Sequence, residues 1–115
     1  MAEAKEMAAL AAAAADDKKA ADVQVVDVTG KSDVCDYLVV CTCANNPQTN
    51  AVIDEVEERL RKDLDVKPLS VEGRQGQSWV LLDYGPVVVH VMQPEARDFY
   101  RIEKLWAEVP EREAS

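Results

Sequence analysis

The sequence WVLLDYGPVVVHVM, residues 79–92, decides the fold class of this 115-residue chain. It holds two β-type apolar runs, 79–84 and 87–92, separated by Gly85-Pro86. This dipeptide fits the centre of a type II′ turn, because glycine accepts a positive φ and proline the negative φ that follows. We therefore predict an antiparallel hairpin.

Upstream of the hairpin, three runs rich in β-branched residues predict strands at 23–28, 37–43 and 67–72. A helix is predicted between the second and third of these strands. The stretch Asn45-Asn46-Pro47 supplies a capping side chain followed by proline at the first helical position, and apolar residues then recur at helical spacing.

Both ends of the chain are also predicted to be helical. Pro94 begins a last helix whose apolar side chains recur as far as Trp106. Residues 1–22 are rich in alanine, which favours a helix, but they carry few large apolar side chains, so we expect this helix to be peripheral. The chain then divides into this helix, a single domain at 23–108 and a charged tail at 109–115.

The predicted elements follow the order αββαβββα. A helix between the second and third strands permits a parallel crossover, whereas the hairpin is antiparallel, so the sheet is expected to be mixed. The predicted fold is an α/β (α+β) domain with a mixed β-sheet of about five strands covered by helices.

Charge restricts the class of partner. The chain has 13 Lys and Arg residues against 22 Asp and Glu residues, a formal net charge of -9. Nucleic acid and anionic membranes require clustered cations, so neither is expected as the main contact, whereas a basic protein is. The apolar run at 8–15 is too short to span a membrane, and the first twenty residues lack the charge balance of a transit peptide, so a cytoplasmic location is expected.

Catalysis, a metal and a cofactor receive little support. Cys41 and Cys43 project from the same side of a strand without a second ligand pair, so we expect buried reduced thiols. His90 is the sole histidine, and with Asp83 across the hairpin it would form an acid/base pair, but a structural histidine is the simpler interpretation. The glycine-containing loop after the third strand lacks the lysine and helix of a phosphate-binding loop. The charged residues at 54–62 are interpreted as a solvated helix face.

The segment 66–93 combines balanced charge with amphipathic rings. It contains Trp79, Tyr84 and His90. Low charge with such rings is typical of the core of a protein interface. The same pattern also fits the buried face of the sheet, and both interpretations remain open.

Short motifs in a fixed order extend on both sides of the hairpin. They are Val26-Asp27-Val28, Gly30-Lys31-Ser32, Asp36-Tyr37, Val39-Val40-Cys41-Thr42, Val71-Glu72-Gly73, Arg97-Asp98-Phe99-Tyr100 and Leu105-Trp106. Together with the hairpin, these motifs give residues 22–106 a sequence that resembles the ribosomal silencing factor family, also called Iojap-like proteins.

The resemblance implies a non-enzymatic function. Members of the family bind the large ribosomal subunit through its fourteenth protein and prevent the small subunit from joining. Their fold is similar to a nucleotidyltransferase core without the catalytic machinery. The implied partner is therefore a basic ribosomal protein, with no cofactor and no metal.

The chain departs from the family pattern in two places. At 43–49 it reads Cys-Ala-Asn-Asn-Pro-Gln-Thr, where the family usually has a glycine and then a stretch such as Ser-x-Arg-His, so a basic contact is expected to be lost. Pro86 stands where members often carry an acid after the hairpin glycine.

We predict a partner-binding face with Trp79 as its aromatic anchor. The other predicted residues are Asp36, Glu72 and Asp83, which would face basic side chains, and Tyr37, Tyr84, His90 and Tyr100, which would shape the patch.

Two other functions are compatible with the sequence. One is a small enzyme related to nucleotidyltransferases, which would hold Mg²⁺ with Asp36 and Asp83. The other is a homodimeric adaptor assembled through a sheet edge.

Overall fold

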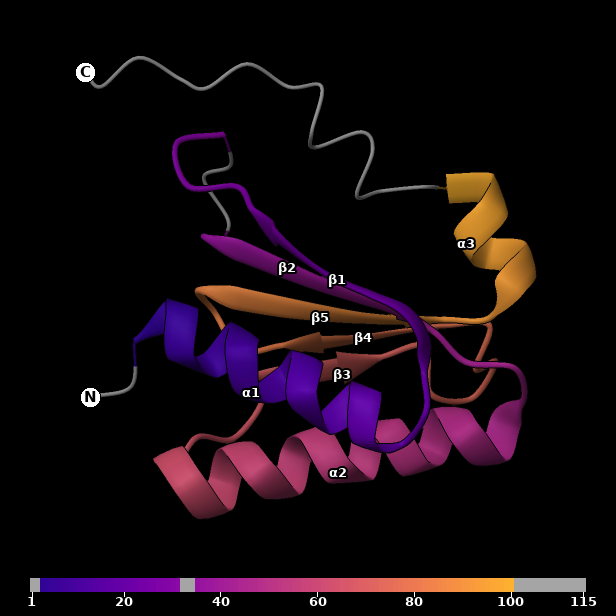
Figure 1. Cartoon of the computed structure of the whole chain (residues 1–115), viewed down its shortest axis with the longest axis horizontal. Helices are drawn as coiled ribbons and strands as arrows, with labels where there is room; N and C mark the ends of the chain where they lie inside the picture. Colours follow the sequence, from indigo (N-terminus) through magenta and orange to yellow (C-terminus); the bar gives the residue numbers. More distant parts are fainter. Residues whose placement is uncertain (1–2, 32–34, 101–115) are drawn as a thin grey trace.

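The computed structural model describes residues 3–31 and 35–100 (Figure 1). The order of the elements confirms the prediction αββαβββα. They are α1 (Ala4–Asp17), β1 (Ala21–Asp27), β2 (Tyr37–Thr42), α2 (Asn46–Leu64), β3 (Ser70–Glu72), β4 (Trp79–Asp83), β5 (Val87–Met92) and α3 (Pro94–Tyr100).

The strands form one mixed sheet in the order β1-β2-β5-β4-β3. β2 and β5 are parallel, and the other neighbouring pairs are antiparallel. The predicted hairpin is β4 and β5, which are joined by a turn in which the Tyr84 amide donates to the Val87 carbonyl (2.9 Å) and Gly85 has φ +91°. The fold class predicted from the sequence is thereby confirmed.

Two strands begin at other residues than predicted. β3 begins at Ser70 rather than at residue 67, because Pro68 has no backbone donor and cannot join a ladder in the ordinary way. β1 begins earlier than predicted, at Ala21, and its pairing with β2 shifts register between Ala21 and Gln24.

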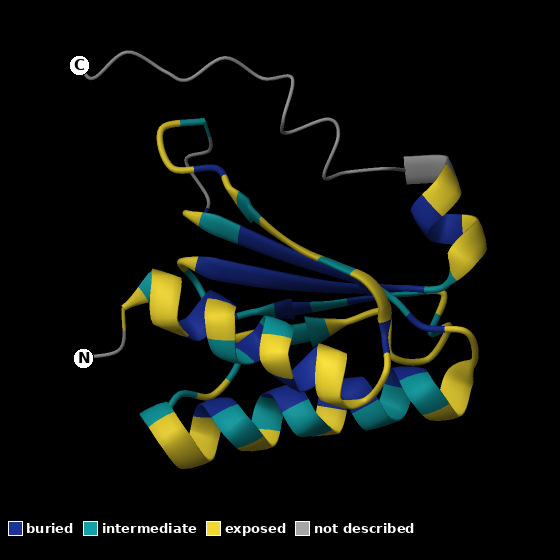
Figure 2. Cartoon of the chain, in the orientation of Figure 1, coloured by how far each residue is buried: buried dark blue, intermediate teal, exposed yellow. Residues whose placement is uncertain are grey.

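α1 and α2 cover one face of the sheet, and each is buried along one side and exposed along the other (Figures 1 and 2). The side chains of Val52, Ile53, Val56 and Leu60 on α2 are fully buried against this face. A capping side chain is present, because Asn45 Oδ1 accepts from the Gln48 amide (2.9 Å), but the helix begins at Asn46, so Pro47 is its second residue rather than its first as predicted.

The expectation of a peripheral N-terminal helix was wrong. Ala11, Ala14 and Ala15 are fully buried, and α1 contributes to the same core as α2. Alanine lets the helix backbone approach its neighbours closely, so a helix with few large side chains can still be buried. Its end is held to α2 by an ion pair between Asp17 and Arg59 and by Gln48, whose amide donates to the carbonyls of residues 18 and 19.

A second, smaller apolar cluster lies on the opposite face. Leu38, Val40, Val88 and Met92 are buried there, and Ala96 of α3 packs with them. In Figure 1, α3 lies at one end of the sheet, apart from α1 and α2. Within the described residues, no helix is both long and apolar enough to cross a membrane.

The packing of α1 predicts a large effect of added volume. Replacing fully buried Ala11 with Leu inserts three carbon atoms between α1 and its neighbours and should lower the free energy of unfolding by about 1–3 kcal/mol. Ala13→Leu, on the exposed side of the helix, should change it by no more than about 0.5 kcal/mol. Urea denaturation followed by circular dichroism measures both, and equal stability of the two variants would contradict the observed packing.

Candidate functional site

The second face of the sheet is built by alternate residues of its strands, which the register aligns in rows. Across β2, β5 and β4, these rows are Leu38-Val88-Asp83, Val40-His90-Leu81 and Thr42-Met92-Trp79, and Glu72 of β3 continues the second row. We call the part formed by Glu72, Trp79, Leu81, Asp83 and His90 the candidate face.

Trp79 and His90, from neighbouring rows of this face, form a hydrogen-bonded pair. The indole Nε1–H of Trp79 donates to His90 Nδ1 (2.9 Å), and the two ring centroids lie 5.9 Å apart. His90 is only 8% exposed, and this burial lowers its pKa to about 4. The imidazole is therefore neutral near neutral pH, with its proton on Nε2, and it fixes the orientation of the indole.

Carboxylates lie farther along the sheet, at the hairpin turn and on the edge strand β3. Asp83 is partly buried, and its Oδ1 accepts from the Gly85 amide (2.8 Å), which holds the carboxylate at the hairpin turn. Glu72 is exposed on β3. Asp36 is exposed just before β2 and is tied to the same turn through its amide, which donates to the Pro86 carbonyl (2.7 Å).

Two of the predicted tyrosines, Tyr37 and Tyr84, lie on the opposite side of the sheet from the candidate face. Tyr84 is 4% exposed within the core beneath α1 and α2, where burial, followed by the charge of Glu57, raises the pKa of its hydroxyl. Tyr37 is partly buried against the same core. The side chain of Tyr100 lies outside the described residues.

Two residues important to the face were missed by the sequence analysis. Leu81 is partly buried between His90 and β3, and it supplies apolar surface beside Trp79. Gly73 has φ +82°, and a Cβ atom there would lie 2.2 Å from the Trp79 carbonyl oxygen. This glycine lets the loop after β3 pass directly against the start of β4, so it positions Trp79.

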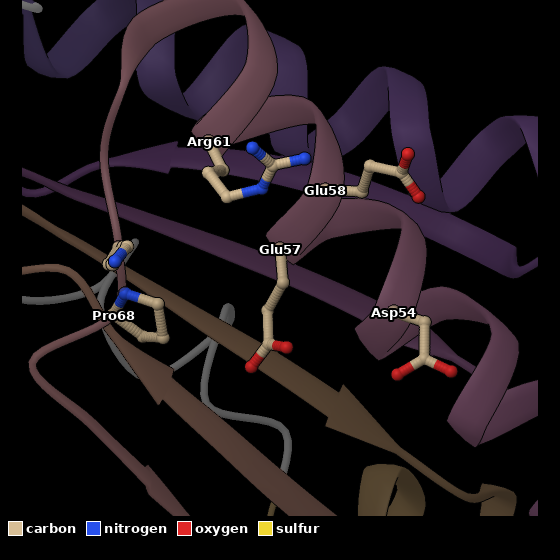
Figure 3. Close-up of a pocket in the computed structure, with 6 residues that line it drawn as sticks. Asp54, Glu57, Glu58, Arg61 and Pro68 are labelled. Atoms are coloured by element: carbon tan, nitrogen blue, oxygen red, sulfur yellow. The ribbon is translucent and has the colours of Figure 1, made fainter.

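A hollow of about 570 Å³ lies elsewhere, between α2 and the segment before β3. Asp54, Glu57, Glu58, Arg61, Lys67 and Pro68 line it, and Figure 3 shows the Glu57 side chain extending from α2 toward the strands. Its acids and bases are close to balanced, and Asp54 is paired with Arg74 (3.1 Å). The exposed positions of Asp54, Glu58 and Arg61 confirm the predicted solvated face of α2.

All three cysteines are buried, as predicted for Cys41 and Cys43. Cys41 and Cys43 lie in the core beneath α1 and α2, and Cys35 belongs to the cluster on the opposite face. Among residues 3–31 and 35–100, no group of three or more His, Cys, Asp or Glu side chains is arranged to hold a metal ion.

Comparisons with known proteins agree with the motifs. The model of the family described as "Ribosomal silencing factor during starvation" matches residues 1–115. The ribosomal silencing factor RsfS of Bacillus subtilis is 37% identical over 106 residues, which cover 92% of this chain and 89% of that protein. The chloroplastic protein Iojap of Zea mays is 31% identical over 101 residues, covering 83% of this chain and 41% of the maize protein.

A solved structure has the same fold. A crystal structure of a Chromobacterium violaceum protein aligns with a TM-score of 0.86 at 35% sequence identity, covering 99% of this chain and 95% of that chain. The likeness extends over α1, so the alanine-rich helix is part of the matched fold.

The buried histidine predicts a loss of stability in acid. The pKa of His90 is about 4 in the folded chain, against an ordinary value near 6.5, so the unfolded chain takes up a proton first as the pH falls. The contribution of His90 should be fully present above about pH 6.5 and decline by about 3 kcal/mol as the pH falls to about 4.

Urea denaturation at several pH values measures this decline. Carboxylates titrate in part of the same range, so the informative quantity is the difference between the chain and its His90→Gln variant, which lacks the ionisable ring. The variant should show the shallower dependence between about pH 6.5 and 4. Parallel curves would show that His90 does not carry the effect.

Proposed function

Because the chain belongs to the ribosomal silencing factor family, we propose that it binds the large ribosomal subunit through the subunit's fourteenth protein and prevents the small subunit from joining. The observation that carries this proposal is the candidate face, where His90 holds Trp79 in place on the same side of the sheet as the carboxylates of Asp83 and Glu72. No chemical step is required, because occupation of the surface is sufficient.

The composition of the candidate face supports a basic protein as partner. A rigid aromatic residue is a common energetic centre of protein interfaces, and its indole is already oriented before binding. Carboxylates around such a centre favour basic side chains and disfavour acidic ones. The formal net charge of -9 would speed the encounter with a cationic ribosomal protein and oppose contact with exposed RNA phosphates.

Steric exclusion accounts for silencing in this proposal. A standard protein interface covers about 800 Å² on each partner, which a domain of this size can supply with one face of its sheet. The other face is covered by α1 and α2, whose outer sides would then project from the ribosomal surface and stand in the way of the small subunit.

Subunit joining tests the proposed function directly. Purified small and large subunits are mixed with an excess of the protein and separated on a sucrose gradient. Joined ribosomes should decrease and the protein should travel with the large subunit. Unchanged formation of joined ribosomes at saturating protein would refute exclusion.

Trp79→Ala should weaken binding to the large subunit by about 2 kcal/mol or more, which is roughly a 30-fold rise in Kd. The indole is partly buried, so thermal unfolding must first show that the variant is folded at the temperature of the binding measurement. Leu69→Ala is the matched control, because this side chain is 74% exposed and lies outside the candidate face. Wild-type affinity in a folded Trp79→Ala variant would remove Trp79 from the contact.

Charge reversal separates the candidate face from the rest of the acidic surface. Glu72→Lys should weaken binding by about tenfold and reduce its salt dependence, because a carboxylate facing a basic partner is replaced by a cation. Glu58→Lys makes the same change on the exposed side of α2 and should have a much smaller effect. Equal effects of the two variants would indicate that net charge, rather than this face, determines affinity.

A further inference from the structure

Arg97 of α3 is a charged residue in an almost fully buried position. It is 5% exposed, although a buried guanidinium is stable only with hydrogen-bonding or ionic partners. In the sequence, Arg97 stands out only as the first residue of the motif Arg97-Asp98-Phe99-Tyr100.

Its contacts join three separate elements. Arg97 Nη1 donates to Thr42 Oγ1 at the end of β2 (2.9 Å), and Arg97 Nη2 lies 3.2 Å from Asp22 Oδ2 on β1. α3 is thereby connected to two strands that precede it by more than fifty residues in the sequence. Among the described side chains of α3, Ala96 packs in the second cluster.

The backbone of β1 is shaped to present Asp22 to this arginine. Asp22 has φ +49°, a left-handed conformation that is unusual for a residue other than glycine, and it lies where the register of β1 and β2 shifts. The Gln24 side-chain amide donates to Asp22 Oδ1 (3.0 Å), which leaves the other carboxylate oxygen for Arg97. A strained conformation at a carboxylate that pairs with a buried cation indicates a constrained contact.

The arginine also lies beside the candidate face. Its partner Thr42 shares a row of the sheet with Met92 and Trp79. Met92 is fully buried between them and packs in the same cluster as Ala96, the residue before Arg97. A shift of α3 would therefore change the packing of Ala96 in the cluster that contains Met92 and the Trp79 ring.

We propose that Arg97 is a positioning residue, which holds α3 on the sheet through Thr42 and Asp22 and thereby fixes the shape of the candidate face. The effect on ribosome binding rests on the proposed function of that face. The effect on α3 itself does not, and the two are measured separately.

Hydrogen exchange in the free protein tests the placement of α3. The Arg97 amide donates to the Gln93 carbonyl (3.0 Å) and reports opening of this helix. Arg97→Met keeps the apolar stem and removes the guanidinium, so exchange at residues 97 and 98 should accelerate about tenfold or more while β5 amides stay protected. Arg61→Met, the same change at an exposed position on α2, should leave these rates unchanged.

Milder variants keep the test informative if Arg97→Met does not fold. Asp22→Asn and Thr42→Val each remove one partner and should accelerate the same amides by about threefold, whereas Arg97→Lys, which keeps the charge, should lie between wild type and Arg97→Met. Wild-type exchange in all of these variants would overturn the positioning role.

Binding to purified large subunits tests the second part. Arg97→Met should raise Kd by about tenfold, Arg97→Lys should recover part of this loss, and Arg61→Met should bind as wild type does. Faster exchange with unchanged affinity would show that α3 does not shape the binding face and would overturn that part of the proposal. If the wild-type chain itself fails to bind, the proposed function is refuted, and the exchange rates alone decide whether Arg97 positions α3.

Discussion

The central strand β5 must be buried on both of its faces, and the rest of the structure follows from this requirement. All six residues from Val87 to Met92 are buried, and the strand is paired with β2 on one side and β4 on the other. A strand with no exposed face requires apolar cover above and below the sheet. α1 and α2 supply the cover on one face, and the cluster that includes Ala96 of α3 forms on the other.

The single histidine of the chain must also meet this requirement, because it lies in β5. His90 is the polar exception in β5, and burial is tolerated because the ring stays neutral and its Nδ1 receives the indole proton of Trp79. The same bond that satisfies a buried nitrogen gives the candidate face a fixed aromatic side chain. The stability of β5 and the fixed orientation of Trp79 therefore both depend on the hydrogen bond between Trp79 and His90.

Local patterns were sufficient to predict the order of the elements, the hairpin and the mixed sheet, because each depends on short-range signals such as Gly85-Pro86 and the capping stretch Asn45-Asn46-Pro47. The burial of α1 was not predictable in this way, since alanine is buried only when a neighbouring element comes close enough, and that distance is a tertiary property. Alternation along β4 puts Tyr84 on the same side of the sheet as Val80 and Leu82. The sequence of β4 does not show that α1 and α2 cover this side, so the burial of Tyr84 was not predictable from it. The close approach at Gly73 likewise depends on the path of a loop.

Because alanines of α1 pack against the core, the buried and exposed sides of this helix differ in their tolerance to mutation. Where Ala11, Ala14 and Ala15 meet their neighbours, any residue with atoms beyond Cβ must displace backbone or core side chains, so only very small residues fit. On the outer side, at positions such as Glu6 and Ala13, size and charge are nearly unrestricted. Sequence drift in this helix should therefore change its surface charge while its inner side stays almost invariant, and the low complexity of the segment reflects a spatial restriction rather than an absence of structure.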